Sequence, residues 1–553
     1  MQVDYTPTHS EILVVIGAGA TAVLGMPQTN SQTNIFRDLS KNEKSKEEVL
    51  SGRFSGADLT KVISFLEVLD GNGNDFFDIS DKDLENAKII YGNKNEKLLR
   101  DRILELRTEY DWNAAKKIIG ICPNNESHDN LIRDLYSIID GKLLAHQSLK
   151  VSVENEYEIL SESRLRGARN FLTLFINMLF ASAWYKIANG EKSDEFNKYK
   201  KFINSFDRIM QKEAREFHRT YSVESRDFYL FSTSFVSFNF EMVFPWVLMN
   251  SHYELNHQKS YMQDRPLKLW LDFGCEHRGR KTGEGGNIIS TLKFTEAVAS
   301  RENEDDHVGS ELNRCGKFYF AHGSSNWREC PVCGRMTFYN GDSESKWEYK
   351  SKQLISPFPI PLFGNEKNKA ITKKEKEWHE KLRFDALQCM HCGSETHASD
   401  APMIMQTMYK STPTSFLEEI QRNVKVCLEK ARHIVLLGYS LPPDDTIWQH
   451  AFAEGVRSRI ETQNAAFCTV VVGFKGERRW IYSDDLDSYI KNYKNVDGYG
   501  ADAIENAISI FGKKKVRAWT GGIPQVFGDC TERDVNELFY PDFVEWSETR
   551  LKM

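Results

Sequence analysis

Apolar residues are arranged in two ways along this chain, as short continuous runs and as helically spaced positions. Short apolar runs occupy residues 11–16, 434–437 and 467–472, and segments of strand character occupy 228–239, 267–273 and 317–321. Runs of this length that end at glycine or polar residues are typical of parallel strands buried on both faces. Helical spacing lies between the later runs, over Phe416 to Ala431 and again around 448–459. Alternating strands and helices predict an α/β fold built on a doubly wound, Rossmann-like parallel sheet.

Residues 38–224 follow a different pattern. They are rich in Glu, Lys, Leu and Ile at helical spacing, which predicts a large helical insertion. The longest uncharged run, Asn170 to Tyr185, is shorter than the ~20 apolar residues that a membrane span needs. We therefore expect it to be a buried core helix, and we expect no membrane association. Residues 276–310 are polar and acidic and contain glycine, so they predict a surface loop.

Composition narrows the class of protein. The 553 residues include 72 Lys and Arg against 79 Asp and Glu, so the formal net charge is −7. This balance gives no global attraction to nucleic acid, and no direct nucleic-acid binding is expected. The first residues lack the basic and apolar regions of a signal peptide, and six of the ten cysteines are scattered singly. Both features indicate a cytoplasmic protein.

The other four cysteines form two pairs, Cys330 with Cys333 and Cys389 with Cys392. Each Cys-x-x-Cys turn directs two thiolates toward one point, and two such turns complete the tetrahedron that zinc prefers. The alternatives are four ordinary buried thiols, or a site in which His391 or His397 replaces a cysteine.

These observations divide the chain into four parts. The sheet domain is expected from residues 1–37, 225–329 and 401–530. The helical insertion covers 38–224, the zinc-binding module 330–400, and a C-terminal tail 531–553.

A glycine-rich loop follows the first apolar run. Residues 17–22 read Gly-Ala-Gly-Ala-Thr-Ala, which satisfies the G-x-G-x-x-A pattern that brings a backbone close to a pyrophosphate at a helix N-terminus. The pattern alone is weak, because a plain tight turn also needs glycine. An ordinary dinucleotide dehydrogenase also places an acidic residue about 20 positions later at a strand end. Asp38 has that distance, but its surroundings are not those of a strand end.

Five elements in this order resemble the sirtuins, the NAD-consuming sirtuin superfamily. The glycine loop with Gly25-Met26-Pro27 is similar to the opening loop of that family, and residues 237–241 are similar to its asparagine signature. His322-Gly323 is similar to its His-Gly, the two cysteine pairs to its zinc module, and residues 438–441 to its late Gly-x-Ser loop.

The resemblance implies specific roles. Asn239 would lie beside the nicotinamide ribose, His322 would be the general base, and zinc would be structural. Residues implied to contact the dinucleotide are Gly17, Ala18, Gly19, Ala20, Thr21, Gly25, Pro27, Ser237, Phe238, Gly438, Tyr439 and Ser440. A carboxamide can hold a water or a ribose hydroxyl without becoming charged, and a histidine can take a proton near neutral pH. The alternatives are a turn-capping role for Asn239, and a core or zinc-ligand role for His322.

The chain departs from the protein-deacylating sirtuins at the peptide-binding positions. Gln28-Thr29-Asn30 stands in place of their Phe-Arg-Ser, and Phe238 and Glu241 stand in place of Gln and Asp. Residues 401–407 lack the Phe-Gly-Glu element that pairs with an acyl peptide as an added strand. His322 to Trp327, His-Gly-Ser-Ser-Asn-Trp, is similar to the divergent prokaryotic sirtuin-like branch.

That branch implies an NAD+ hydrolase that forms nicotinamide and ADP-ribose and acts in anti-phage defence. The resemblance also implies a homo-oligomer, often with a ring-shaped ATPase or another sensor protein as partner. Two other functions stay open: an NAD-dependent protein deacylase or ADP-ribosyltransferase, and a non-catalytic sensor of NAD or ADP-ribose.

Overall fold

The apolar runs of the sequence form one central sheet whose strands are nearly all parallel. In spatial order it contains β16 (Arg479–Ile481), β17 (Val516–Thr520), β15 (Phe467–Val472), β14 (His433–Leu437), β1 (Ile12–Ile16), β5 (Thr233–Ser237), β9 (Leu312–Phe320) and β4 (Tyr229–Leu230), and β6 (Leu267–Asp272) also pairs with β9. Only the pairing of β16 with β17 is antiparallel among the described strand pairs of this sheet. The predicted Rossmann-like α/β sheet is thereby confirmed.

The coordinates are a computed structural model of the whole chain. It describes residues 12–41, 43–71, 77–122, 131–153, 156–191, 193–220, 229–230, 233–248, 251, 267–275, 277–282, 289–291, 312–342, 355–363, 372–405, 415–442, 445–460, 466–473, 475, 477–496, 498–523 and 532–539.

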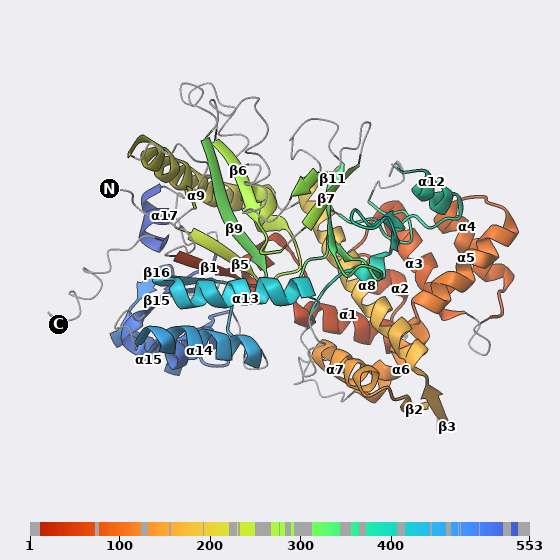
Figure 1. Cartoon of the computed structure of the whole chain (residues 1–553). Helices are drawn as coiled ribbons and strands as arrows, with labels where there is room; N and C mark the ends of the chain where they lie inside the picture. Colours follow the sequence, from red (N-terminus) through yellow and green to blue (C-terminus); the bar gives the residue numbers. More distant parts are fainter. Residues whose placement is uncertain are drawn as a thin grey trace.

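Helices cover both faces of the sheet (Figure 1). On one side lie α13 (Ser415–Lys430), α14 (Thr446–Ile460), α15 (Ser483–Tyr493) and α16 (Ala501–Phe511). The other side carries α9 (Ser193–Thr220) and α17 (Glu532–Phe539). Because both faces are covered, every residue of β1, β14 and β15 is buried, which explains their continuous apolar sequences.

Aromatic contacts attach α9 and α17 to the sheet. The Phe206 ring lies 5.4 Å from Phe235 of β5 and 4.8 Å from Phe539 of α17. Thus α9, from the predicted helical insertion, and α17, from the predicted C-terminal tail, both belong to the covering layer of the sheet. Their sequences show helical spacing but do not reveal this shared partner.

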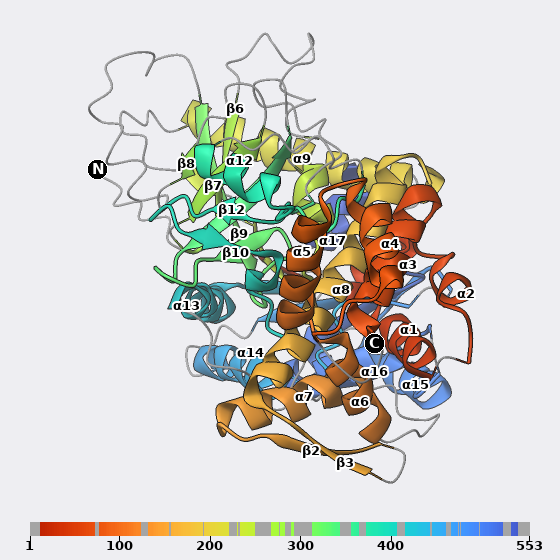
Figure 2. The same ribbon diagram turned by 90° about the vertical axis from the view of Figure 1, so that its right-hand side faces the viewer.

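The segment between β1 and α9 is mostly helical. It contains α1 (Thr29–Lys41), α2 (Lys46–Leu50), α3 (Gly56–Asp70), α4 (Asp81–Tyr91), α5 (Glu96–Glu109), α6 (Trp112–Ile121), α7 (Leu131–Leu144), the hairpin β2 (Leu149–Val153) and β3 (Glu156–Leu160), and α8 (Glu162–Ala188). Viewed from that end, these helices gather around α8, which contacts α5, α6 and α7 (Figure 2).

Helix α8 includes the predicted core helix. By length and composition it could span a membrane, but 78% of its most apolar window is buried inside the fold. Phe171, Phe175 and Trp112 of α6 stack there, with ring centroids 4.7 to 5.6 Å apart. Its apolar character is therefore explained by core packing, as the sequence predicted.

A second, four-stranded sheet contains β10 (Trp327–Glu329), β11 (Met336–Asp342), β7 (His277–Thr282) and β8 (Ile289–Thr291). The prediction of a surface loop over 276–310 is wrong where β7 and β8 form. Their sequences are polar, and they become strands because β11 and β7 pair across a long stretch of chain. Within residues 330–400 the described chain also forms α12 (Lys373–Glu380), β12 (Leu387–Gln388) and β13 (Glu395–Thr396).

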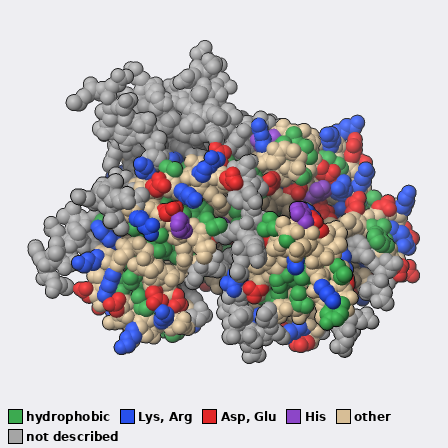
Figure 3. All heavy atoms as spheres, turned by 60° about the horizontal axis from the view of Figure 1, so that its bottom comes forward, with side chains coloured by type: hydrophobic (Ala, Val, Ile, Leu, Met, Phe, Trp, Pro, Cys, Tyr) green, Lys and Arg blue, Asp and Glu red, His purple; other side chains and the backbone are tan. Residues whose placement is uncertain are grey.

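Charged side chains of both signs are interspersed over the face drawn in Figure 3. The described part of that face carries no large area of a single charge. This distribution agrees with the modest net charge of −7.

Candidate active site

The loops that carry the predicted functional residues lie side by side at one edge of the central sheet. The last residues of the four strands are in register: Ile16 pairs with Leu437 and with Ser237, and Ser237 pairs with Phe320. The following loops therefore leave the sheet in one row, at the carboxyl ends of parallel strands. Ligands of open α/β sheets bind at this edge.

The glycine loop packs directly against the loop after β14. The Gly17 amide donates to Leu437 O and the Gly19 amide to Gly438 O, both at 3.0 Å. A Cβ on Gly17 would lie 2.6 Å from Gly438 O, and one on Gly438 would lie 2.2 Å from the nitrogen of Ala20. Gly438 also has a φ of +61°. These glycines are thus required by the contact between the two loops, whatever ligand the edge holds.

The other predicted contact residues are distributed around this junction. Ala18, Gly19, Gly25 and Ser440 are exposed, whereas Ala20, Thr21, Pro27, Ser237, Phe238 and Tyr439 are buried. The exposed part of the glycine loop is where a dinucleotide could approach the backbone.

Asn239 is buried beside the glycine loop and is held by several hydrogen bonds. Its Nδ2 donates to Gly17 O at 3.1 Å and to Glu241 Oε1 at 2.8 Å. The Thr21 hydroxyl donates to the same Glu241 oxygen at 2.8 Å, and the Val243 amide donates to Glu241 Oε2 at 2.8 Å. Burial raises the pKa of Glu241, and these three donors partly offset that effect. Glu241 therefore fixes the orientation of the Asn239 carboxamide.

The asparagine and histidine loops are joined to each other. Ser325 donates its amide and Ser324 its hydroxyl to Phe240 O, at 2.9 and 3.0 Å. The Phe238 ring contacts His322 edge-on, with centroids 5.0 Å apart. The structure thus brings Asn239 and His322, 83 positions apart in sequence, into one small region of the sheet edge.

His322 is 5% exposed and faces a carboxylate. Its Nε2 lies 3.6 Å from Asp445 Oδ2, and the same oxygen accepts a hydrogen bond of 3.1 Å from the Tyr439 hydroxyl. Phe238 stacks on Tyr439 at 4.3 Å and completes the apolar surroundings. Sequence reasoning missed Asp445, because nothing in Pro-Pro-Asp-Asp indicates which side chain turns toward a histidine more than 100 positions earlier. Glu241 was noticed only as a departure from the family pattern.

The four paired cysteines meet at one point, as predicted. Cys330 Sγ lies 3.5 Å from Cys392 Sγ, and Cys333 Sγ lies 3.7 Å from Cys389 Sγ. All four sulfurs lie within 4.8 Å of one another, a donor set that could bind a metal such as zinc. His391 is not in this group, since its Nε2 contacts Met336 O at 3.0 Å.

Two similar turns build the cysteine cluster. Gly334 and Gly393 each follow the second cysteine of a pair with a φ of +64° and +77°. Each donates its amide to the carbonyl of the first cysteine of its pair, at 2.8 and 2.9 Å. The hydroxyl and the amide of Ser394 lower the pKa of Cys392 to about 6 and favour its thiolate form, whereas burial raises the pKa of Cys330 and of Cys333.

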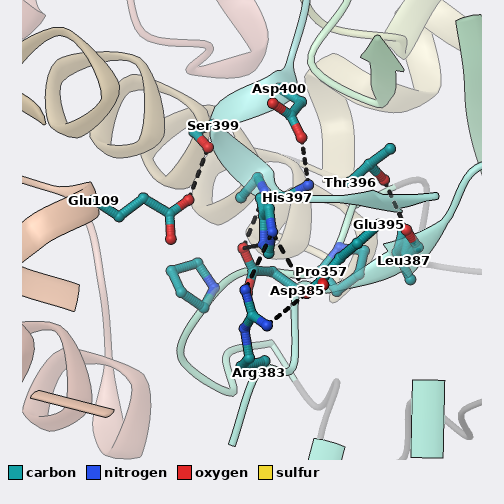
Figure 4. Close-up of polar contacts among 12 residues, drawn as sticks. Glu109, Pro357, Arg383, Asp385, Leu387, Glu395, Thr396, His397, Ser399 and Asp400 are labelled. Carbon is teal, nitrogen blue, oxygen red and sulfur yellow. Dashed lines mark hydrogen bonds and ion pairs between the residues drawn. The ribbon is translucent and has the colours of Figure 1, made fainter. Parts of the chain in front are cut away.

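A second group of possible ligands, Glu109, Asp385 and His397, lies where α5 meets the zinc-binding module (Figure 4). Two arginine side chains already provide the positive charge that a metal ion would bring to this group. Arg102 approaches Asp385 Oδ1 at 3.6 Å, and an Arg383 nitrogen lies 3.4 Å from His397 Nε2. Burial raises the pKa of Glu109. We therefore interpret this group as an electrostatic contact between α5 and the module, and not as a second metal centre.

No family model matches this chain, and no curated protein matches it in a sequence search. What the site can do chemically therefore follows from its residues. A carboxamide with a fixed orientation, a buried histidine facing a carboxylate, and an exposed glycine backbone lie at one sheet edge. Such an arrangement can orient a hydroxyl or water and accept its proton beside a bound nucleotide.

Proposed function

We propose that this protein is a sirtuin-like NAD+ hydrolase, which cleaves NAD+ with water to nicotinamide and ADP-ribose. The observation that supports it best is the joining of the Asn239 and His322 loops through Phe240 O, next to the glycine loop. This is the arrangement that the resemblance to the sirtuins requires. A Rossmann-like sheet with a cysteine cluster inserted after the histidine agrees with it.

The proposed reaction breaks the bond between nicotinamide and ribose C1′. Positive charge develops on the ribose, and a water oxygen forms the new bond to C1′. The Asn239 nitrogen is used by Gly17 O and Glu241, so its Oδ1 is the atom that accepts a hydrogen bond from the water or a ribose hydroxyl. His322 takes the proton that this step releases. Cys330, Cys333, Cys389 and Cys392 would hold zinc with four thiolates and no open position for substrate, so the metal would have a structural role.

Access to the site suggests how it is controlled. Asn239 and His322 are 7% and 5% exposed, so the surrounding loops must open before C1′ can reach them. A constitutive NAD+ hydrolase would deplete the cell that makes it. We propose that assembly of a homo-oligomer, or a partner such as a ring-shaped ATPase, opens the site in the cytoplasm during anti-phage defence.

The same burial favours one alternative function. A closed site in which Glu241 engages Asn239 also suits a non-catalytic sensor that binds NAD or ADP-ribose and signals to a partner. Such a sensor would bind nucleotide tightly and leave it intact. Product analysis separates the two functions.

The test is product analysis with the purified, zinc-loaded chain and NAD+, with and without an acyl-lysine peptide. We expect equal nicotinamide and ADP-ribose without peptide, and a loss of at least about a hundredfold in Asn239→Ala and in His322→Ala. Asn93→Ala and His450→Ala change exposed residues of the same types and serve as controls. Intact NAD+ with tight binding, by the assembled oligomer and with its partner protein present, would support the sensor and overturn the hydrolase. A strict requirement for the peptide would indicate a deacylase.

A further inference from the structure

We propose that Asp445 is a positioning residue for His322: its carboxylate fixes the imidazole ring and pairs with it when the ring takes up a proton. This inference rests on the proposed function, and it adds a residue that the resemblance does not assign. Through Asp445, the chain that follows β14 also contacts His322, the proposed proton acceptor.

The backbone of Asp445 is held rigidly. Its amide donates to Pro442 O at 3.0 Å, and its carbonyl accepts from the amides of Trp448 and Gln449 at 3.0 and 2.9 Å. These bonds place Asp445 at the start of α14, a 15-residue helix. A carboxylate is favoured at a helix N-terminus, because the helix dipole is positive there.

The side chain of Asp445 is directed by a second group. The Tyr439 hydroxyl donates to Oδ2 at 3.1 Å, and the same oxygen faces His322 Nε2 at 3.6 Å. The Asp445 side chain is 4% exposed and that of His322 is 7% exposed, so water screens their interaction little. Phe238 and Phe240, the rings that contact His322, are uncharged.

In this geometry the two imidazole nitrogens of His322 have different roles. With Nε2 facing Asp445, Nδ1 is the atom that takes the proton released by the reaction. Protonation gives a buried cation among aromatic rings, which is unfavourable unless an anion compensates for it. The Asp445 carboxylate supplies that anion and holds the ring orientation, as in other histidine–carboxylate pairs.

Tyr439 gives the pair a connection to the nucleotide. It belongs to the loop that packs against the glycine loop, where the dinucleotide is expected to bind. Its hydroxyl is bonded to the carboxylate that faces the proton acceptor. Movement of this loop therefore also moves the partner of His322.

The kinetic test compares Asp445→Asn with Asp485→Asn, a matched change of an exposed aspartate in α15. In Asp445→Asn we expect kcat to fall by about ten- to a hundredfold with KM nearly unchanged. Loss of the anion disfavours the protonated ring, so the acid limb of the pH–rate profile should move to lower pH by about one unit. Tyr439→Phe should shift the limb in the same direction by less, with the exposed Tyr482→Phe as its control.

A second measurement does not depend on NAD turnover. The titration of His322 is followed by NMR in protein with labelled histidine, and its signal is assigned by its loss in His322→Ala. We expect the midpoint to fall by about one pH unit in Asp445→Asn and to stay constant in Asp485→Asn.

The two measurements separate the possible failures. An unchanged His322 midpoint in a folded Asp445→Asn variant would overturn the role of Asp445, even if the wild type hydrolyses NAD+. A shifted midpoint in a protein that never hydrolyses NAD+ would retain the pairing and overturn the proposed function. An Asp445→Asn variant with wild-type kcat and pH profile would also contradict the proposal.

Discussion

Two buried histidines lie at opposite edges of the central sheet and have opposite electrostatic partners. His322 follows β9 at the carboxyl edge and faces Asp445. His433 begins β14 at the amino edge, and its Nε2 contacts the Thr469 hydroxyl at 2.8 Å, a hydroxyl that also accepts from Arg517. Because Phe539 O can only accept, Nδ1 carries the proton and donates to it, and in the neutral ring Nε2 then accepts from the Thr469 hydroxyl.

The comparison indicates a division of roles between the two edges. Burial, with the charge of Arg517, lowers the pKa of His433 to about 3, so this ring stays neutral and its bonds are those of a stable core. The carboxylate beside His322 instead favours uptake of a proton. The amino edge thus contributes stability, and the carboxyl edge holds the histidine and carboxylate to which we assign the proton transfer of the proposed reaction.

The cysteine cluster belongs to neither edge, and its loss should have the largest effect on stability. Cys389→Ser removes one of the four clustered thiols that could bind a metal. We expect it to lower the metal content of the protein, and to lower its free energy of unfolding by about 4 kcal/mol or more. Metal analysis and urea denaturation measure both quantities. Cys468→Ser changes a buried cysteine of β15 outside the cluster and should keep the metal. Unchanged metal content in Cys389→Ser would contradict the four-thiolate site.

Gly438→Ala tests the contact between the two loops at the carboxyl edge. The new Cβ would lie 2.2 Å from Ala20 N at a φ of +61°, so we expect a loss of about 3 kcal/mol. Gly25→Ala has a similar φ of +85° but nothing within 4 Å of the new Cβ, so it should cost only about 1 kcal/mol. Equal losses in thermal or urea unfolding would show that strain alone, and not the packing of the loops, requires glycine at 438.

His433→Gln tests the amino edge through the pH dependence of stability. The unfolded chain takes up a proton on this residue below pH 6.5, whereas the folded chain does so only near pH 3. Its contribution is therefore present above pH 6.5 and is lost as the pH falls toward 3. Between pH 6.5 and 5 the wild type should lose about 2 kcal/mol through this group, and the variant should not.

Urea denaturation at the two pH values measures this difference. His450→Gln, at an exposed histidine of α14, should behave like the wild type. A wild-type pH dependence in His433→Gln would remove the proposed contrast between the two histidines.

The smallest of these effects concerns the hydroxyl of Thr21. Thr21→Val removes one of the three donors to the buried Glu241, and we expect a loss of about 1.5 kcal/mol. Thr21→Ser keeps the hydroxyl and should lose less. If both variants are equally stable by urea denaturation, Glu241 does not depend on this bond.

Much of the fold could be predicted from local sequence. Buried parallel strands such as residues 12–16 and 467–472 are continuous apolar runs, and each cysteine pair sits in a local turn that brings two sulfurs together. What could not be predicted depends on distant partners. Strand β7 forms because β11 pairs with it, and helix α9 covers the sheet through Phe206.

The same limit applies to the candidate site. The identities of Asn239 and His322 come from short motifs, and the structure places both at the predicted strand ends. The groups that orient them, Glu241 and Asp445, are ordinary acidic residues in the sequence. Their roles arise from burial and from contacts across loops, which no local pattern encodes.

The most direct test of the central claim is nicotinamide release from NAD+ by the purified zinc-loaded chain over a wide range of protein concentration. We expect release without any acyl acceptor, increasing more steeply than the protein concentration because assembly opens the site. The Asn239→Ala and His322→Ala variants should lose this release although they still fold, as a cooperative urea-unfolding transition would show. No release at any concentration, with or without the partner protein, or equal release by folded variants, would contradict the assignment of the carboxyl edge as an NAD+ hydrolase site.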